Sequence, residues 1–214
     1  IQDFTIPGYP DTNTMMPIRE LSRLIRASNI GFDVIFFDSC ILGNAEVIEE
    51  FKDSAPYLVL SQRETPYNSF PLGALFQSMF KKTYTPRELA RSIPEMYAKA
   101  YSVGGLLAPD EEEYDVVTSV SIDTAKWTPF VNEFRSFVDL LSKQGFRSRL
   151  AENAKALTAF TDIDSNIDVW QFFNGIQSYM HDSSVTSAAN KILDRIGYPS
   201  MVAAKKAASI SIKG

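Results

Sequence analysis

Cysteine and histidine are almost missing from the chain. Its 214 residues include one cysteine, Cys40, and one histidine, His181. A single cysteine excludes a disulfide within the chain and a zinc site with several cysteine ligands. Cys40 is therefore expected to be a free thiol, which in most proteins is a small buried apolar side chain and in a minority a nucleophile.

Long apolar runs are missing as well. No stretch approaches the roughly 18 apolar residues that a membrane-spanning helix needs, and the first residues, IQDFTIPGYPD, lack the basic and apolar regions of a signal peptide. We expect Ile1 to be a processed or trimmed terminus, with a cloning boundary as the alternative. The formal net charge of −5 gives no electrostatic reason to expect nucleic acid or an anionic membrane as a partner.

The first part of the chain alternates strand-like and helical patterns. Apolar residues at helical spacing predict a helix over 16–28, and continuous apolar runs predict buried strands over 32–37 and 56–61, with a helix over 43–53 between them. The apolar stripe of the first helix comprises Ile18, Leu21, Leu24 and Ile25. Two strands joined by a helix form a βαβ unit, which needs a parallel sheet covered by helices on both faces. The predicted fold class is α/β.

The later part is mostly helical. Helices are predicted over 73–82 and over 85–102, the latter capped by Thr85, and a strand over 114–122 is followed by Asp123 as the cap of the next helix. Further helices are expected near 124–145, 147–157, 167–180 and 184–196, and the final AASISI alternates like a strand that returns to the sheet. The predicted parts are an α/β portion over 1–122, a helical subdomain over 123–199 and a returning strand over 200–214.

Cys40 lies where the first predicted strand ends. Ligands bind outside the carboxyl ends of parallel strands, and the loop over 61–71 leaves the second strand at the same edge, so the two loops are expected to flank one cleft. The helix that begins near Gly43 is expected to direct its amide groups and positive end toward the thiol. That arrangement would lower the pKa of the thiol and form part of an oxyanion site.

Residues 32–66 resemble the clostripain family of caspase-like cysteine peptidases. In that family a strand leads into Asp-Ala-Cys, apolar residues, a small residue and a Glu-bearing helix, and the next strand ends in Ser-Glu-Glu. The matching positions here are Asp38, Ser39, Cys40, Ile41, Leu42, Glu46 and Ser61. A weaker similarity reaches residues 166–176 and the SISI segment near the end.

The resemblance implies a caspase-like three-layer α/β/α fold with a mostly parallel sheet, and a cysteine endopeptidase that cuts after Arg or Lys. Cys40 would form the acyl-enzyme and a histidine would act as general base and acid. In the family this histidine precedes the cysteine, but residues 1–39 contain none, and His181 comes too late in the chain. We therefore expect an N-terminal light chain to supply it, as in relatives that are cut between the two residues.

Substrate recognition is expected to involve Asp38, Ser61, Glu64, Thr65 and Asn68. A buried Arg or Lys side chain needs a carboxylate, and Asp38 is the first candidate, although it is nearly as suited to fixing the turn after the strand. Thr65 is expected at the floor of the pocket. Where the family has acidic residues this chain has Gln62 and Arg63, so Glu64 is expected to supply the second negative charge.

No cofactor is expected, and calcium is implied by the resemblance only. The acidic triplet Glu111 to Glu113 lacks the spaced oxygen ligands of a calcium cage and is predicted to be a solvated face. The resemblance also implies a bacterial protein that is secreted or held in the cell envelope. Two alternatives are a non-catalytic caspase-like binding or scaffold protein, and an unrelated α/β domain with a structural cysteine.

Overall fold

The computed structural model describes residues 16–102, 104–107, 117–144, 166–196 and 211–213. The strands are β1 (Val34–Phe36), β2 (Tyr57–Leu60), β3 (Val120–Asp123), β4 (Asn166–Asp168) and β5 (Ser211–Lys213). The helices are α1 (Ile18–Ala27), α2 (Ala45–Phe51), α3 (Leu72–Lys81), α4 (Pro86–Ala100), the 3-10 turn η1 (Thr124–Lys126), α5 (Trp127–Gln144), α7 (Val169–Tyr179) and α8 (Ser183–Ile196). The predicted helix near 147–157 and the acidic triplet lie outside the described residues.

The described main sheet has the order β1-β2-β3 and is mixed. β1 and β2 are parallel, with Val34 opposite Tyr57, which confirms the predicted βαβ unit. β3 runs antiparallel to β2, because the chain re-enters the sheet at the edge where β2 ends and pairs Leu60 with Val120. The α/β class is thus confirmed, but the prediction of a mostly parallel sheet is wrong for these strands.

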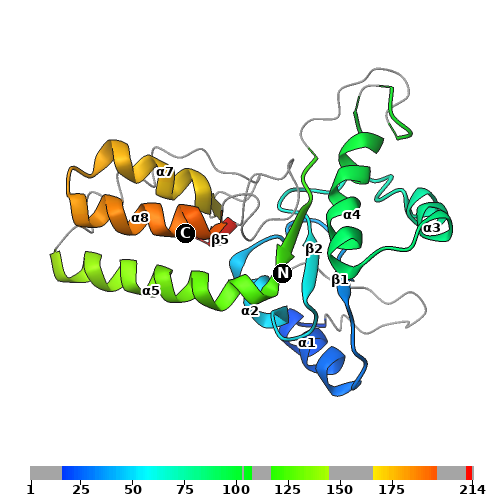
Figure 1. Cartoon of the computed structure of the whole chain (residues 1–214), viewed down its shortest axis with the longest axis horizontal. Coiled ribbons are helices and arrows are strands. Elements are labelled where there is room, and N and C mark those ends of the chain that lie inside the picture. Colours follow the sequence, from blue (N-terminus) through cyan, green and yellow to red (C-terminus); the bar gives the residue numbers. More distant parts are fainter. Residues whose placement is uncertain (1–15, 103, 108–116, 145–165, 197–210, 214) are drawn as a thin grey trace.

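Helices cover both faces of this sheet (Figure 1). Side chains of β2 alternate between them: Leu58 and Leu60 pack in the apolar cluster that includes Phe51 of α2, whereas Val59 packs with Ile93 of α4. The β1 strand was predicted to be buried on both faces, yet its three residues are only half-buried. The reason is its place at the edge of the described sheet.

The helices α5, α7 and α8 form a layer beside the sheet (Figure 1). Its aromatic core includes Phe137 and Phe173, whose ring centroids lie 5.0 Å apart in an edge-on arrangement. These side chains belong to the same apolar cluster as Phe51 and Trp127, so the core continues from the sheet into the helical layer. The division of the chain at residue 123 stays a prediction.

The last strand was expected to return to the main sheet, and in the described residues it does not. β5 instead pairs antiparallel with β4, with Ile167 opposite Ile212. β4 directly precedes α7, whose first turn is capped by Asp168: the amide of Gln171 donates to its carboxylate at 2.7 Å. The predicted cap Asp123 is also confirmed, as its carboxylate accepts from the amide of Ala125 at 3.1 Å.

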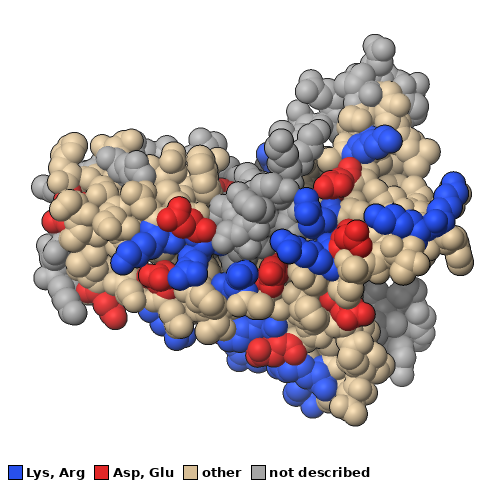
Figure 2. All heavy atoms as spheres, in the orientation of Figure 1, with Lys and Arg blue, Asp and Glu red and all other residues tan. Residues whose placement is uncertain are grey.

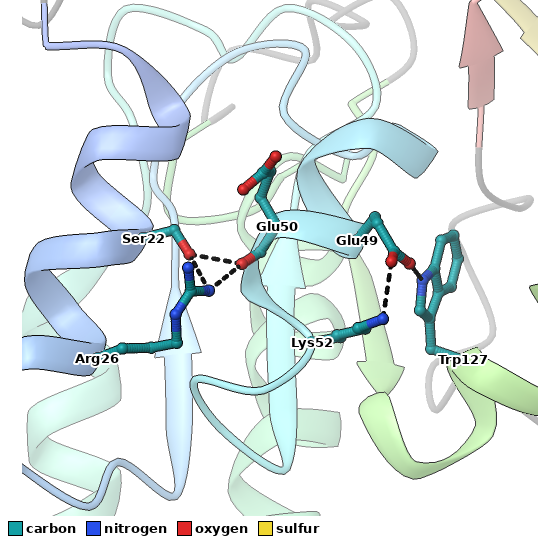
Figure 3. Close-up of polar contacts among 6 residues, drawn as sticks. All are labelled: Ser22, Arg26, Glu49, Glu50, Lys52 and Trp127. Atoms are coloured by element: carbon teal, nitrogen blue, oxygen red, sulfur yellow. Dashed lines mark hydrogen bonds and ion pairs between the residues drawn. The ribbon is translucent and has the colours of Figure 1, made fainter.

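Polar contacts join α2 to its neighbours on both sides (Figure 3). The buried Ser22 of α1 donates to the carbonyl of Glu50, and Arg26 donates to the same carbonyl at 2.7 Å. On the other side the buried indole of Trp127 donates to Glu49. The face of α1 that packs against α2 is thus centred on Ser22. Leu24, which was predicted on the apolar stripe of this helix, lies beside that face and is 41% exposed.

Acidic and basic side chains are interspersed over the face that Figure 2 shows, without a large area of one sign. Among the described helices, none is long and apolar enough to cross a membrane.

The predicted cap of α4 is confirmed as a full capping box, in which Thr85 and Glu88 each accept from the backbone amide of the other.

Candidate active site

Two loops meet at the carboxyl edge of β1 and β2. Cys40 follows β1 and is partly buried, and the amide of Thr65, in the loop after β2, donates to its Sγ atom at 3.1 Å. The thiol also lies 3.9 Å from the carbonyl oxygen of Thr65. The predicted juxtaposition of the two loops is thus confirmed, and it places Cys40 at their junction.

Backbone hydrogen bonds fix the turn that carries Cys40. The amide of Ile41 donates to Arg63 at 3.1 Å and that of Gly43 donates to Ser61 at 2.7 Å. Gly43 has to be glycine, because a Cβ atom there would lie 2.8 Å from Cγ of Gln62. Ile41 has a φ of 60°, a left-handed conformation that is rare for a β-branched residue and strains the turn directly after the thiol.

Hydrogen bonds occupy several amides at the start of α2. The helix begins at Ala45, two residues after Gly43, which agrees with the predicted start, and the amide of Val47 in its first turn donates to Asn44 at 2.9 Å. The amides of Ile41 and Gly43 are bonded to the loop after β2. These three amides are already bonded, and the expected oxyanion site at the start of α2 stays a prediction.

Asp38 makes a second connection between the loops. Its exposed carboxylate accepts hydrogen bonds from the hydroxyl of Ser69 and from the amide of Phe70, the latter at 3.3 Å. The carbonyl of Ser69 in turn accepts from the hydroxyl of Tyr101 at 2.7 Å. Asp38 thus joins the loop after β1 to the loop after β2. The sequence suggested hydrogen bonds within the turn after β1, whereas these two bonds connect segments that are distant in the chain.

A small pocket opens beside this junction. It is lined by Phe36, Phe37, Asp38, Leu60, Ser61, Thr65, Phe70, Tyr97, Thr118 and Ser119, and it offers a volume of about 10 Å³, close to the space of one water molecule. Three of the predicted substrate-binding residues line it: Asp38, Ser61 and Thr65. Glu64 and Asn68 are exposed and are not among its lining residues.

Thr118 supports the pocket from the segment before β3. Its hydroxyl accepts from the amide of Gln62 at 3.2 Å and from that of Arg63 at 3.0 Å, and its carbonyl accepts from the hydroxyl of the buried Ser61 at 2.8 Å. Sequence reasoning missed Thr118, because a threonine in a β-branched strand pattern carries no signal of such a role.

Two hydroxyls at the pocket have no hydrogen-bond partner among the described residues. They are those of Thr65 and Tyr97, and both are buried. Burial raises the pKa of Tyr97, as do the nearby Tyr101 and Asp38, while the adjacent Thr65 hydroxyl opposes the shift. Tyr97 was also missed, because an aromatic residue within a predicted amphipathic helix carries no signal of contact with the pocket.

No second member of a catalytic dyad contacts Cys40 among the described residues. His181 is exposed in the connection between α7 and α8, which lies at the end of the helical layer remote from the sheet (Figure 1). The described residues also contain no group of three or more His, Cys, Asp or Glu side chains that could hold a metal ion.

Several solved structures share this fold at low sequence identity. A clostripain from Bacteroides thetaiotaomicron, solved with a peptide inhibitor, has a TM-score of 0.62 and 14% identity over 96% of this chain and 89% of that one. A cysteine protease of B. fragilis has a TM-score of 0.59 and 16% identity, over 96% and 87% of the two chains. An inactive protease zymogen from Parabacteroides distasonis has a TM-score of 0.62 and 17% identity, over 93% of this chain but only 56% of that one.

The sequence itself matches a family model. No curated protein matches the chain significantly. The model of the clostripain family matches residues 5–202, which include Cys40, the loop after β2 and most of the helical layer. The chain therefore belongs to the clostripain family of cysteine peptidases.

Proposed function

We propose that Cys40 is the nucleophile of an endopeptidase that cuts after Arg or Lys, with a general base that comes from another segment of the protein. The observation that carries this proposal is the position of Cys40, where two anchored loops meet beside a pocket. The thiolate attacks the scissile carbonyl carbon, and a histidine takes the thiol proton and returns it to the leaving amine. Water then hydrolyses the thioester and frees the thiol.

The preference for a basic side chain rests on charge at the pocket. Asp38 brings a carboxylate to its wall, and Ser61 and Thr65 add hydroxyl groups. A carboxylate offsets the lost hydration of an ammonium or guanidinium group. The inhibitor bound to the B. thetaiotaomicron relative carries the peptide VLTK, which ends in lysine and supports the same preference here.

The pocket has to widen before it holds such a side chain, because about 10 Å³ is several times too small for a lysine. In this proposal the substrate displaces side chains that line the pocket, while the backbone of the loop over 61–70 keeps its anchored position. Glu64 and Asn68, which are exposed on that loop, then become the additional polar groups for the basic side chain.

The open edge of β1 is the proposed place of the histidine segment. β1 is apolar, is only half-buried and pairs on one side only within the described sheet. An apolar edge of this kind suits the addition of a further strand. A light chain paired there would bring its own residues to the edge of the sheet where Cys40 lies.

Relatives that include secreted proteases support a secreted or cell-envelope location for the assembled bacterial protein.

The test begins with protein purified from the full-length gene. Intact mass is measured under native and denaturing conditions, before and after treatment with a lysyl or arginyl chloromethyl ketone. We expect a histidine-containing segment to accompany the chain and one ketone molecule to bind. Because Cys40 is the single cysteine of this chain, Cys40→Ala removes the chain's only thiol and is the control for the site of labelling.

The outcomes separate the parts of the proposal. Labelling that persists in Cys40→Ala would exclude Cys40 as the nucleophile. Equal reaction with a ketone that carries a neutral side chain would remove the preference for Arg or Lys. If no accompanying histidine segment is found in an active protein, the proposed source of the base is wrong.

A further inference from the structure

Tyr67 stands out among the residues near Cys40 because its large side chain is fully exposed, with a relative exposure of 104%. It lies in a turn in which the amide of Ser69 donates to the carbonyl of Pro66 at 2.8 Å. The ring is therefore presented to solvent at the tip of the loop that contacts the thiol. None of the roles proposed for this loop uses it.

The turn is anchored on both sides. Before it, the amide of Thr65 is bonded to Cys40. After it, Ser69 and Phe70 both donate to Asp38, and Tyr101 donates to the carbonyl of Ser69. Only three residues separate Thr65 from Ser69, so the place of Tyr67 relative to the thiol is narrowly constrained.

Chain geometry limits how far the ring lies from the reaction centre. The amide of Thr65 is 3.1 Å from the sulfur, and two further residues extend the chain by at most about 7 Å. An extended peptide covers about 10 Å with three residues. The Tyr67 backbone is therefore within the span of the two or three substrate residues nearest the scissile bond.

An exposed aromatic ring on a fixed loop is suited to binding an apolar side chain. The ring offers a large apolar area, and a loop that is already ordered loses little conformational entropy when a ligand packs against it. Phe80, another exposed aromatic side chain at 91% exposure, lies on α3, outside the two loops that meet at Cys40. The anchoring distinguishes Tyr67 from an incidental exposed residue.

We propose that Tyr67 is a specificity-determining residue, which packs against an apolar side chain of the substrate next to the residue whose carbonyl is cut. The inference rests on the proposed peptidase function but not on the preference for Arg or Lys. It predicts that good substrates combine the residue held in the pocket with an apolar neighbour. Glycine or a charged residue at that neighbouring position would lose the contact.

The test uses the assembled full-length enzyme and a set of peptides that hold the best residue before the scissile bond. Four other positions are varied in turn: the two residues that precede this best residue and the two residues that follow the scissile bond. Each position carries leucine, phenylalanine, alanine or aspartate. For Tyr67→Ala we expect kcat/KM to fall about three- to tenfold for leucine and phenylalanine at one of these positions, and less than about twofold for alanine. Tyr67→Phe should retain the preference.

Phe80→Ala is the matched control, because it removes a similarly exposed ring on α3, outside the loop that contacts the thiol. Thermal unfolding of all variants checks that they fold. If Tyr67→Ala changes no preference, or if Phe80→Ala changes the same preference equally, the inference is overturned while the peptidase function stands. If the wild-type enzyme cleaves peptides without preference for basic residues but the Tyr67 effect appears, only the proposed Arg or Lys preference fails. If it cleaves no peptide at all, both proposals fall.

Discussion

Individual residues at the junction of the two loops combine structural and chemical roles. Asp38 illustrates this, because it ties Ser69 and Phe70 to β1 and also brings the only carboxylate among the described residues that line the pocket. A substitution that keeps the acceptor oxygen but removes the charge separates the two roles.

We expect Asp38→Asn to fold normally and to lose activity selectively. Its amide oxygen can still accept from Phe70, whereas the attraction for a basic side chain is lost. Loss of one charged hydrogen bond corresponds to about a ten- to hundredfold fall in kcat/KM for lysyl and arginyl peptides. Methionyl peptides provide the comparison, and an equal fall for both classes would show that Asp38 acts only on the fold.

Tyr97 gives a prediction about alkaline pH. Burial first, then Tyr101 and Asp38, raise its pKa, so the folded state favours the neutral phenol. The stability that this contributes is present below about pH 10 and is lost as the pH rises above it, because the unfolded chain releases the proton first. Tyr97→Phe also removes a buried hydroxyl that makes no hydrogen bond to another described residue. We expect it to be at least as stable at neutral pH and to lose less stability between about pH 9 and pH 11.

Urea unfolding at each pH measures this effect. Tyr67→Phe, at an exposed site, is the matched control. The idea fails if the two variants show the same dependence of unfolding free energy on pH.

Among the elements, α2 has a central place because it contacts α1 on one side and the start of α5 on the other (Figure 3). The Glu49 carboxylate accepts from the buried indole of Trp127 and from Lys52. Burial acts to raise the pKa of Glu49, but these hydrogen bonds outweigh it and the pKa is lowered. The resulting stabilisation is therefore present at neutral pH and is lost as the pH falls through the lowered value.

We expect Glu49→Ala to reduce the unfolding free energy by about 1 to 3 kcal/mol, because the buried indole N–H loses its acceptor. Glu49→Gln retains an acceptor and should lose less. Glu46→Ala, an exposed position on the same helix, is the matched control. Chemical denaturation monitored by tryptophan fluorescence measures all three, and an equal loss in Glu46→Ala would contradict the role of the indole contact.

The cap of α4 offers a second test at this scale, since this helix covers one face of the sheet and carries Tyr97. Thr85→Ala breaks the capping box with Glu88 and should cost about 1 kcal/mol of stability. Thr83→Ala, two residues earlier and outside the capping box, should have a much smaller effect on the thermal midpoint. A similar loss in both variants would show that the cap contributes little.

The elements also show what the sequence alone could predict. The apolar runs of β1 and β2 and the intervening α2 were predictable, because a βαβ unit is encoded by local patterns, and Thr85 and Asp123 were predictable as caps. The direction of β3 was not, since nothing in its own residues specifies the edge at which it enters. Cys40, Asp38, Ser61 and Thr65 were assigned through a family resemblance, whereas the parts played by Thr118 and Tyr97 depend on contacts between distant segments.

For the whole molecule, the main feature is the apolar cluster shared by the sheet and the helical layer. Phe173 is fully buried within it and contacts Phe137 edge-on. We expect Phe173→Ala to cost about 3 to 5 kcal/mol, and to lower the melting temperature of the sheet and of the helical layer together. Calorimetry, with the exposed Trp170→Ala of the same helix as control, tests this. Two separate transitions, with only one shifted, would show instead that the helical layer is an independent subdomain.

The order of the pocket residues along the chain has a consequence for biosynthesis. Every residue that lines the pocket lies between 36 and 119, and the thiol contacts a residue only 25 positions away. Contacts over such short separations form early, because closing a short loop costs little entropy. Once residue 119 has emerged from the ribosome, all the described residues that line the pocket are outside it, before α7 and α8 have emerged.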